Sequence, residues 1–190
     1  MRMPGLWELK SVADLVAVTA FSFGTFPEPL AFSVRAFQAL RDRKDDFDLV
    51  HDNQSLGYGL LAVERVLGLP LIATIHHPIT VDRRLEIEHA TSLYKKLTLA
   101  RWYGFTRMQT EVARRLKRVI TVSENSFADI HRDHKVPEDR MHIVPVGVDP
   151  DLFRPVDSVE QRPGHLITTA SADVAMKGLS YLLEAVAKLR

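Results

Sequence analysis

The chain has no cysteine among its 190 residues. This absence excludes disulfide bonds, thiolate metal sites and cysteine nucleophiles, and it fits a reducing compartment. The 25 basic and 24 acidic residues nearly cancel, so the net charge of +1 points to no class of partner. The longest apolar stretch, residues 12–26, contains Asp14 and is too short to span a bilayer. No secretory leader pattern opens the chain, so we expect a cytoplasmic protein.

From residue 47 onward, short apolar runs alternate with segments of helical spacing. Strands are predicted at residues 47–51, 71–75, 118–122 and 141–144. Helices are predicted at residues 32–40, 58–67, 82–117 with a bend at Gly104, and 124–131, while residues 11–21 fit either a helix or a strand. Ser123 is placed to cap the helix at 124–131. This alternation predicts an α/β fold with a parallel sheet and right-handed crossovers.

A proline- and glycine-rich segment separates the last of these strands from a second α/β pattern. The segment covers residues 147–164 and is interpreted as an interdomain linker. A strand at 165–170 and a helix at 178–189 follow it. We therefore predict an N-terminal domain at residues 1–146 and the beginning of a C-terminal domain at residues 165–190. One βα unit cannot bury a sheet on both faces, so the chain is expected to be a fragment or an unusually short member of a larger architecture.

Polar residues follow two of the predicted strands. His76 and His77 come directly after the run at 71–75, and Asp52 and Asn53 end the run before it. Ligands of open parallel sheets collect at the carboxyl ends of the strands, so all four are candidates for hydrogen bonds to a substrate, the histidines to a hydroxyl or phosphate and Asp52 and Asn53 to a polyol. Pro78 holds His77 extended, so the two histidine side chains diverge and cannot chelate one metal.

Structural interpretations stand beside these functional ones. A histidine at this position can simply hydrogen-bond a loop carbonyl. Asp52 and Asn53 are typical turn residues whose side chains bind nearby backbone, and the turn is the favoured interpretation for this pair.

Lys177 and Gly178 precede the last predicted helix. A lysine at a helix N-terminus opposes the helix dipole, which is reasonable if an anion such as phosphate binds there. The alternative is a solvated lysine.

Residues 91–118 form a strongly basic stretch that also contains aromatic residues. Glu111 is the single acid among eight basic side chains, which are Lys95, Lys96, Arg101, Arg107, Arg114, Arg115, Lys117 and Arg118. Such a stretch can rest on an anionic membrane surface, although a solvated helix face is the favoured interpretation. No nucleic-acid-binding motif accompanies it, so nucleic acid is not expected as a partner.

Several catalytic motifs are absent or incomplete. The run His131-Arg132-Asp133-His134 lacks the asparagine of a kinase catalytic loop and has no third metal ligand nearby in the sequence. No phosphate-binding P-loop, dinucleotide fingerprint, nucleophile elbow or HExxH zinc motif occurs.

Four motifs, taken together and in this order, resemble the family 4 glycosyltransferases. They are Thr-Ile-His-His at 74–77, Val-Ser-Glu-Asn-Ser at 122–126, Val-Pro-Val-Gly-Val-Asp-Pro-Asp-Leu-Phe-Arg-Pro at 144–155, and Lys-Gly-Leu-Ser-Tyr-Leu-Leu-Glu-Ala at 177–185. The resemblance implies the GT-B architecture, in which two Rossmann-like domains face a cleft. It also implies transfer of a sugar from a nucleotide-sugar donor to a hydroxyl of a sugar or lipid-linked acceptor. Retention of configuration is implied, with neither a metal nor a cofactor required.

The resemblance assigns roles to particular residues. His76 would contact the donor sugar near the reacting carbon, and Lys177 with Gly178 would bind the departing diphosphate. Asp52, Asn53 and His77 are then candidates for acceptor binding.

The sequence also departs from the family pattern. Ser171 and Val146 stand where the family usually has arginine and asparagine, and the start of the first domain and most of the second are not recognised. We therefore expect residues 1–190 to be inactive alone. The alternatives are a GT-B-like epimerase or phosphorylase, and a non-enzymatic module that binds membranes or anions through residues 91–118.

Overall fold

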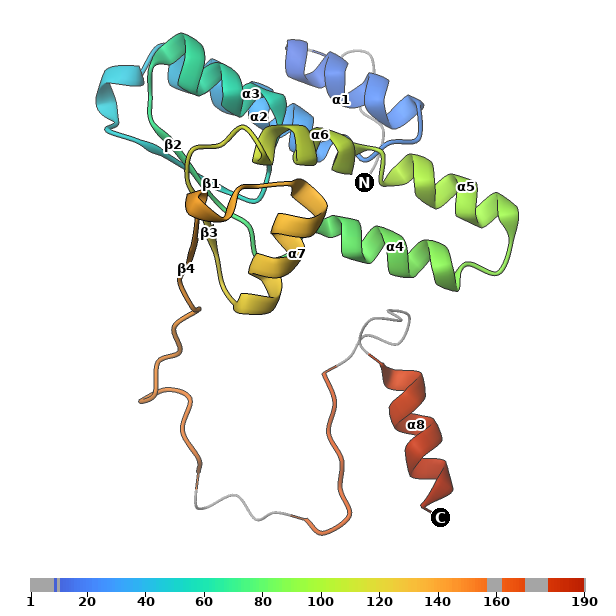
Figure 1. Ribbon diagram of the computed structural model, residues 1–190. Coiled ribbons are helices and arrows are strands. Elements are labelled where there is room, and N and C mark those ends of the chain that lie inside the picture. The colour runs from blue at the N-terminus through green and yellow to red at the C-terminus, as the bar shows by residue number, and fades with distance from the viewer. Residues whose placement is uncertain (1–8, 10, 157–161, 170–177, 190) are drawn as a thin grey trace. The chain divides into compact units, whose positions relative to one another are not determined.

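The computed structural model describes residue 9 and residues 11–156, 162–169 and 178–189 (Figure 1). Packing contacts divide the chain into two units, Met1–Pro145 and Val146–Arg190, and each is described by itself.

The N-terminal unit contains a four-stranded parallel sheet. Its strands are β1 (Val50–Asn53), β2 (Leu71–Thr74), β3 (Val119–Thr121) and β4 (Met141–Ile143), and their spatial order follows the chain. Every neighbouring pair is parallel, with Asn53 beside Thr74 and Thr121 beside Ile143. All four carboxyl ends therefore meet at one edge of the sheet. This arrangement confirms the predicted α/β fold.

Helices connect and flank the strands. They are α1 (Val12–Ser22), α2 (Glu28–Arg41), the 3-10 turn η2 (Lys44–Asp46), α3 (Tyr58–Ala62) with its π-helical continuation η3 (Val63–Leu67), α4 (Ile79–His89), α5 (Leu93–Trp102), α6 (Phe105–Ala113), α7 (Glu124–His134) and η4 (Glu138–Arg140). The ambiguous segment at 11–21 is helical because Ser11 caps α1 by accepting the Asp14 N–H at 3.1 Å. The predicted cap of α7 is confirmed, since the Ser123 hydroxyl accepts the Ser126 N–H at 3.2 Å.

The prediction of one bent helix over 82–117 was wrong. The segment begins earlier, at Ile79, and forms the three helices α4, α5 and α6. Ser92 adopts an extended backbone and its hydroxyl accepts the Lys95 N–H, which starts a new helix after His89. A second break falls at Gly104, where a Cβ atom would lie 2.9 Å from the Arg101 carbonyl oxygen. The capping signal at Ser92 was present in the sequence but was overlooked.

The core lies between the sheet and its helices. Buried Leu60, Ile75, Val112, Leu116 and Ile130 belong to one apolar cluster that joins α3, β2, α6 and α7. α2 packs closely against α3, because a Cβ atom on Gly59 would lie 2.1 Å from the Ser33 carbonyl oxygen. The buried Ser33 hydroxyl accepts the Gly59 N–H at 3.2 Å. This close contact places the start of α3, and with it the loop that follows β1.

The C-terminal unit is described in three pieces. The helix predicted at 178–189 is confirmed as α8 (Leu179–Lys188), which begins after Gly178 with φ of +65°. The strand predicted at 165–170 is not formed over residues 165–169, and Ala170 lies outside the described residues. A strand needs a hydrogen-bonded neighbour, and Ile167 is 95% exposed.

No helix in the described part of the chain combines the length and apolar character needed to cross a membrane.

His134 is a buried histidine of the core. Its Nδ1 lies 2.9 Å from the Thr110 hydroxyl, and only 1% of the residue is exposed. Burial lowers the pKa of this imidazole from 6.5 to about 4, against the opposing effect of the nearby Asp133 carboxylate. His134 is therefore neutral near pH 7.

The depressed pKa of His134 predicts a loss of stability in mild acid. Above pH 6.5 both the folded and unfolded states hold His134 neutral, so its contribution does not change there. As the pH falls from about 6.5 to about 4, the unfolded state binds the proton first and the free energy of unfolding drops by up to about 3 kcal/mol. Urea denaturation across this range should show a flatter profile for His134→Gln than for the wild type or the exposed-site control His89→Gln. Equal slopes for all three proteins would contradict the assignment, and so would an NMR titration of His134 near its ordinary pKa.

Candidate active site at the carboxyl ends of β1 and β2

Two hydrogen-bonded side-chain pairs join the carboxyl ends of β1 and β2. His51 Nε2 lies 2.7 Å from the Thr74 hydroxyl oxygen, and His76 Nε2 lies 2.9 Å from Asn53 Oδ1. An amide oxygen only accepts, so the second contact requires the His76 proton on Nε2. In the neutral ring this leaves Nδ1 as an acceptor for a ligand hydroxyl. The structure thus brings together His76 and Asn53, which the sequence placed on neighbouring strands.

Gln54 bridges the two loops through both atoms of its side-chain amide. Its Oε1 accepts the His76 N–H at 2.7 Å, and its Nε2 donates to the His77 carbonyl at 2.7 Å. The residue has φ of +63°, a left-handed conformation that is uncommon outside glycine. The two bonds tie the backbone of both histidines to the loop after β1.

Gln109 of α6 supports this loop from inside the fold. The residue is 1% exposed, and its Nε2 donates to the carbonyls of Gln54 at 3.4 Å and of Ser55 at 3.3 Å. Sequence reasoning missed both glutamines. Neither belongs to a motif. They lie 55 positions apart in the chain, and nothing in the sequence indicates that they are in contact.

The Asp52 side chain binds the turn that follows it, as expected of a turn residue. The residue is 4% exposed, and its carboxylate accepts from the Ser55 hydroxyl and N–H and from the Leu56 N–H. Both carboxylate oxygens are therefore bonded to the turn that leads into α3. The structure favours this structural role over acceptor contact for Asp52.

The two histidines diverge as the proline at 78 predicts. His76 contacts Asn53 on β1, while His77 Nε2 lies 3.2 Å from the Asp82 carboxylate in the first turn of α4. About half of the His77 side chain is exposed. Among the described residues, no three histidine, aspartate or glutamate side chains gather closely enough to hold a metal ion.

The pair predicted to bind phosphate, Lys177 and Gly178, is described only in part. Gly178 precedes α8 in a left-handed conformation, but Lys177 lies outside the described residues. An approach of Lys177 to His76 stays a prediction.

Residues 131–134, which lack a complete kinase or metal motif, make structural contacts. His131 Nδ1 lies 2.9 Å from the Val136 carbonyl, and the Asp133 carboxylate accepts from the Thr80 hydroxyl at 2.6 Å. Hydrogen bonds from Arg132 and Thr80 help to hold the pKa of Asp133 below its usual range, although burial acts in the opposite direction.

Comparison with known proteins identifies the family of this chain. Residues 4–152 match the model of Glycosyltransferase Family 4, which covers more than half of the chain, and the chain therefore belongs to this family. Over all 190 residues it is 47% identical to the MMP alpha-(1->4)-mannosyltransferase of Mycolicibacterium hassiacum. The match covers 45% of that protein, so the chain spans less than half the length of this relative. The family and the Rossmann-like GT-B fold predicted from the motifs are confirmed.

Removing the Gln54 amide should loosen the loop that carries His76. Gln54→Ala loses both bonds, whereas Gln54→Glu keeps an acceptor for the His76 N–H and loses the donor to His77. Each bond contributes about 1 kcal/mol, so amide exchange at residue 76 should accelerate by roughly fivefold or more in Gln54→Ala. Exchange at 76 should change less in Gln54→Glu, and Gln38→Ala on α2 serves as the control. Unchanged protection at residue 76 in Gln54→Ala would show that the bridge does not hold the loop.

Proposed function

We propose that this chain is the acceptor-side part of a mannosyltransferase that uses a cytoplasmic nucleotide-sugar donor. The mannosyl group would pass to a hydroxyl of a sugar or lipid-linked acceptor with retention of configuration. Membership of family 4 and the similarity to a mannosyltransferase support this proposal. The observation that carries it is His76, whose imidazole sits at the carboxyl ends of the strands with its proton directed by Asn53.

His76 would act as a positioning and polarising group for the donor sugar. Because Nε2–H is donated to Asn53, the lone pair on Nδ1 can accept a hydrogen bond from a hydroxyl of the donor sugar near the reacting carbon. No side-chain nucleophile is required if the leaving phosphate oxygen guides the acceptor hydroxyl. Charge then develops on the diphosphate, where the ammonium of Lys177 and the backbone near Gly178 would neutralise it.

Asn53 and His77 remain the candidates for acceptor contact. Both are exposed, and the Asn53 amide nitrogen has no hydrogen-bond partner within the described ranges. An amide donor and an imidazole suit the hydroxyls of a neutral sugar. An epimerase or phosphorylase of GT-B type would use the same rim, and a screen of products formed from nucleotide sugars separates these reactions.

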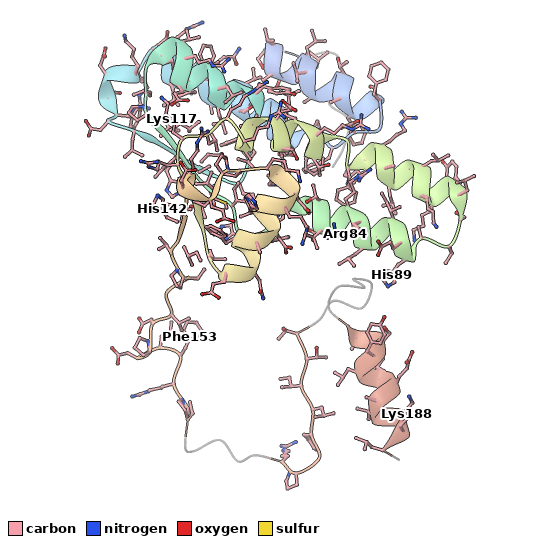
Figure 2. All side chains as sticks on the ribbon, viewed as in Figure 1. Arg84, His89, Lys117, His142, Phe153 and Lys188 are labelled. Atoms are coloured by element: carbon pink, nitrogen blue, oxygen red, sulfur yellow. The ribbon has the colours of Figure 1, made fainter. Side chains whose placement is uncertain are left out.

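Replacing His76 should impair transfer without unfolding the protein. In a full-length protein that contains this chain, His76→Ala is expected to lower kcat/KM by about 100-fold or more, because a group that touches the reacting sugar is lost. His89→Ala is the matched control, since His89 is exposed at the carboxyl end of α4 (Figure 2). The assay follows transfer from a labelled nucleotide mannose, and NMR of the product reports the anomeric configuration. Residues 1–190 alone should show no turnover.

Two outcomes would overturn the proposal. Activity of His76→Ala within twofold of wild type would remove the role of the imidazole. Turnover by residues 1–190 alone would show that the rest of the architecture is not needed.

A second candidate function, contact with a membrane surface, is supported by one helix. α5 exposes Leu93, Tyr94 and Leu97 by 60–81%, with Lys95 and Lys96 beside them. In the rest of the basic stretch the arginines and lysines are exposed while Phe105, Met108 and Val112 are buried in the core, as the interpretation of a solvated helix face expects. Peripheral binding would therefore depend on α5.

The membrane contact is tested by sedimentation with vesicles that contain an anionic lipid. Leu93→Ser with Leu97→Ser should reduce the bound fraction, whereas neutralising Arg114, Arg115, Lys117 and Arg118 should have a smaller effect. If the wild-type chain does not sediment with these vesicles, the membrane function is rejected.

A further inference from the structure

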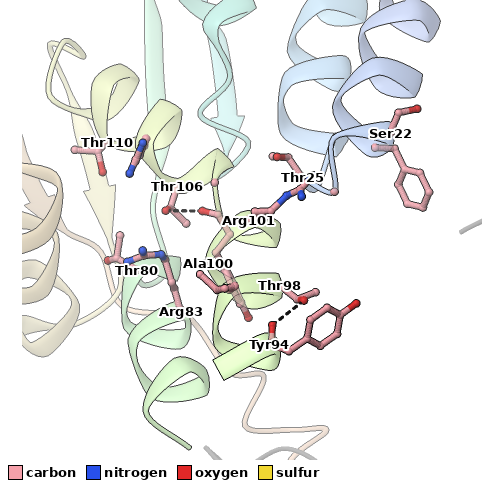
Figure 3. A pocket seen from close by; sticks show the side chains of 16 residues that line it. Ser22, Thr25, Thr80, Arg83, Tyr94, Thr98, Ala100, Arg101, Thr106 and Thr110 are labelled. Carbon is pink, nitrogen blue, oxygen red and sulfur yellow. Dashed lines mark hydrogen bonds between the residues drawn. The ribbon is translucent and has the colours of Figure 1, made fainter. Parts of the chain in front are cut away.

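A large open pocket lies in the N-terminal unit, apart from the pair formed by His76 and Asn53. It has a volume of about 1100 Å³ and is bounded by the end of α1 and by α4, α5 and α6. Figure 3 shows side chains of these helices converging on it. The volume exceeds what one inorganic ion needs and lies slightly above the usual upper size of ligand sites.

The charge around this pocket has one sign. Arg83 from α4, Arg101 from α5 and Arg107 from α6 line it, and no aspartate or glutamate from the described part of the chain does. Among the residues that the structure describes, the guanidinium groups of Arg83 and Arg107 have no hydrogen-bond or ion-pair partner. Arg101 is anchored, because its Nε and Nη2 donate to the Phe23 carbonyl. Two guanidinium groups are therefore available to a ligand beside a third that is held in place.

The acids closest to the pocket already have partners. Asp133 accepts from Thr80 and Arg132, Glu86 accepts from the Tyr103 hydroxyl at 2.8 Å, and Asp82 lies beside His77. These carboxylates do not satisfy Arg83 or Arg107. An anion that enters the pocket meets no carboxylate on its lining.

The hydroxyl groups on the lining mostly donate into the protein. Thr80 donates to Asp133, Thr98 to the Tyr94 carbonyl and Thr106 to the Tyr103 carbonyl. Their protons are used, so the donors left for a ligand are chiefly the guanidinium groups. Guanidinium is planar and binds phosphate or carboxylate through two parallel hydrogen bonds.

We propose that this pocket binds the phosphate or carboxylate group of an acidic ligand through Arg83 and Arg107. Arg83 and Thr80 lie three residues apart on one face of α4, and Arg107 and Thr110 are arranged likewise on α6. The two faces meet at the pocket, so both guanidinium groups can approach one anion. The ligand is either a soluble phosphorylated or carboxylated molecule or the headgroup of an anionic lipid. This inference does not rest on sugar transfer.

Binding is tested with inorganic phosphate on the whole chain. At constant ionic strength, phosphate should bind saturably and should shift the side-chain NMR signals of Arg83 and Arg107. Arg83→Gln and Arg107→Gln should each raise the dissociation constant about tenfold, since each loses charge-assisted hydrogen bonds. Arg65→Gln is the matched control, because Arg65 is exposed on η3 and carries the same charge. Circular dichroism confirms that the variants are folded.

A second arm of the experiment distinguishes a lipid headgroup from a soluble ligand as the source of the anion. Vesicles of phosphatidylcholine with phosphatidylglycerol are compared with vesicles of phosphatidylcholine alone, with and without inorganic phosphate. Vesicle binding that phosphate competes away and that Arg83→Gln abolishes supports a lipid headgroup. Saturable phosphate binding without vesicle binding supports a soluble ligand.

Three results would overturn the inference. They are the absence of saturable phosphate binding, an equal loss of affinity in Arg65→Gln, and binding of neutral mannose in the pocket without any response to phosphate. A full-length protein that contains this chain and that binds phosphate but fails to transfer mannose would refute the proposed function and leave this site standing.

Discussion

The parallel pairing of β1 with β2 determines where the candidate site lies. Because both strands run in the same direction, the segments that follow them leave the sheet at the same edge. The register that sets Asn53 beside Thr74 brings the loop after β1 within hydrogen-bond distance of the residues at 76 and 77. The N-terminal unit depends on this pairing for both its hydrophobic core and its polar rim.

Two side-chain amides hold the loops of the rim together. Gln54 binds the backbone of both histidines, and Gln109 binds the carbonyls of the Gln54 loop from the interior. Asp52 contributes its carboxylate to the turn that starts α3. Neutral hydrogen bonds of this kind fix geometry without placing a competing charge beside His76. Under the proposed function, such an arrangement would leave one nitrogen of the imidazole free for a sugar hydroxyl.

The two polar regions of the N-terminal unit differ in chemistry. The rim near His76 offers imidazole and amide groups, which match neutral hydroxyls. The pocket bounded by α4, α5 and α6 offers guanidinium groups, which match an anion. The connection between them is short, because Thr80 on the pocket wall follows His77 by only three residues.

The sequence alone determined the class of fold, the four strands and the family, because hydrophobic periodicity and short motifs are local properties. It also indicated that His76 and Asn53 share an edge, since parallel strands end together. The division of residues 79–113 into three helices and the roles of Gln54 and Gln109 emerged only from the tertiary structure. The arginine pocket also emerged only from the tertiary structure, since it combines side chains from α4, α5 and α6 with the end of α1. These features depend on contacts between residues far apart in the chain, and no local pattern encodes which distant group will satisfy a given donor or charge.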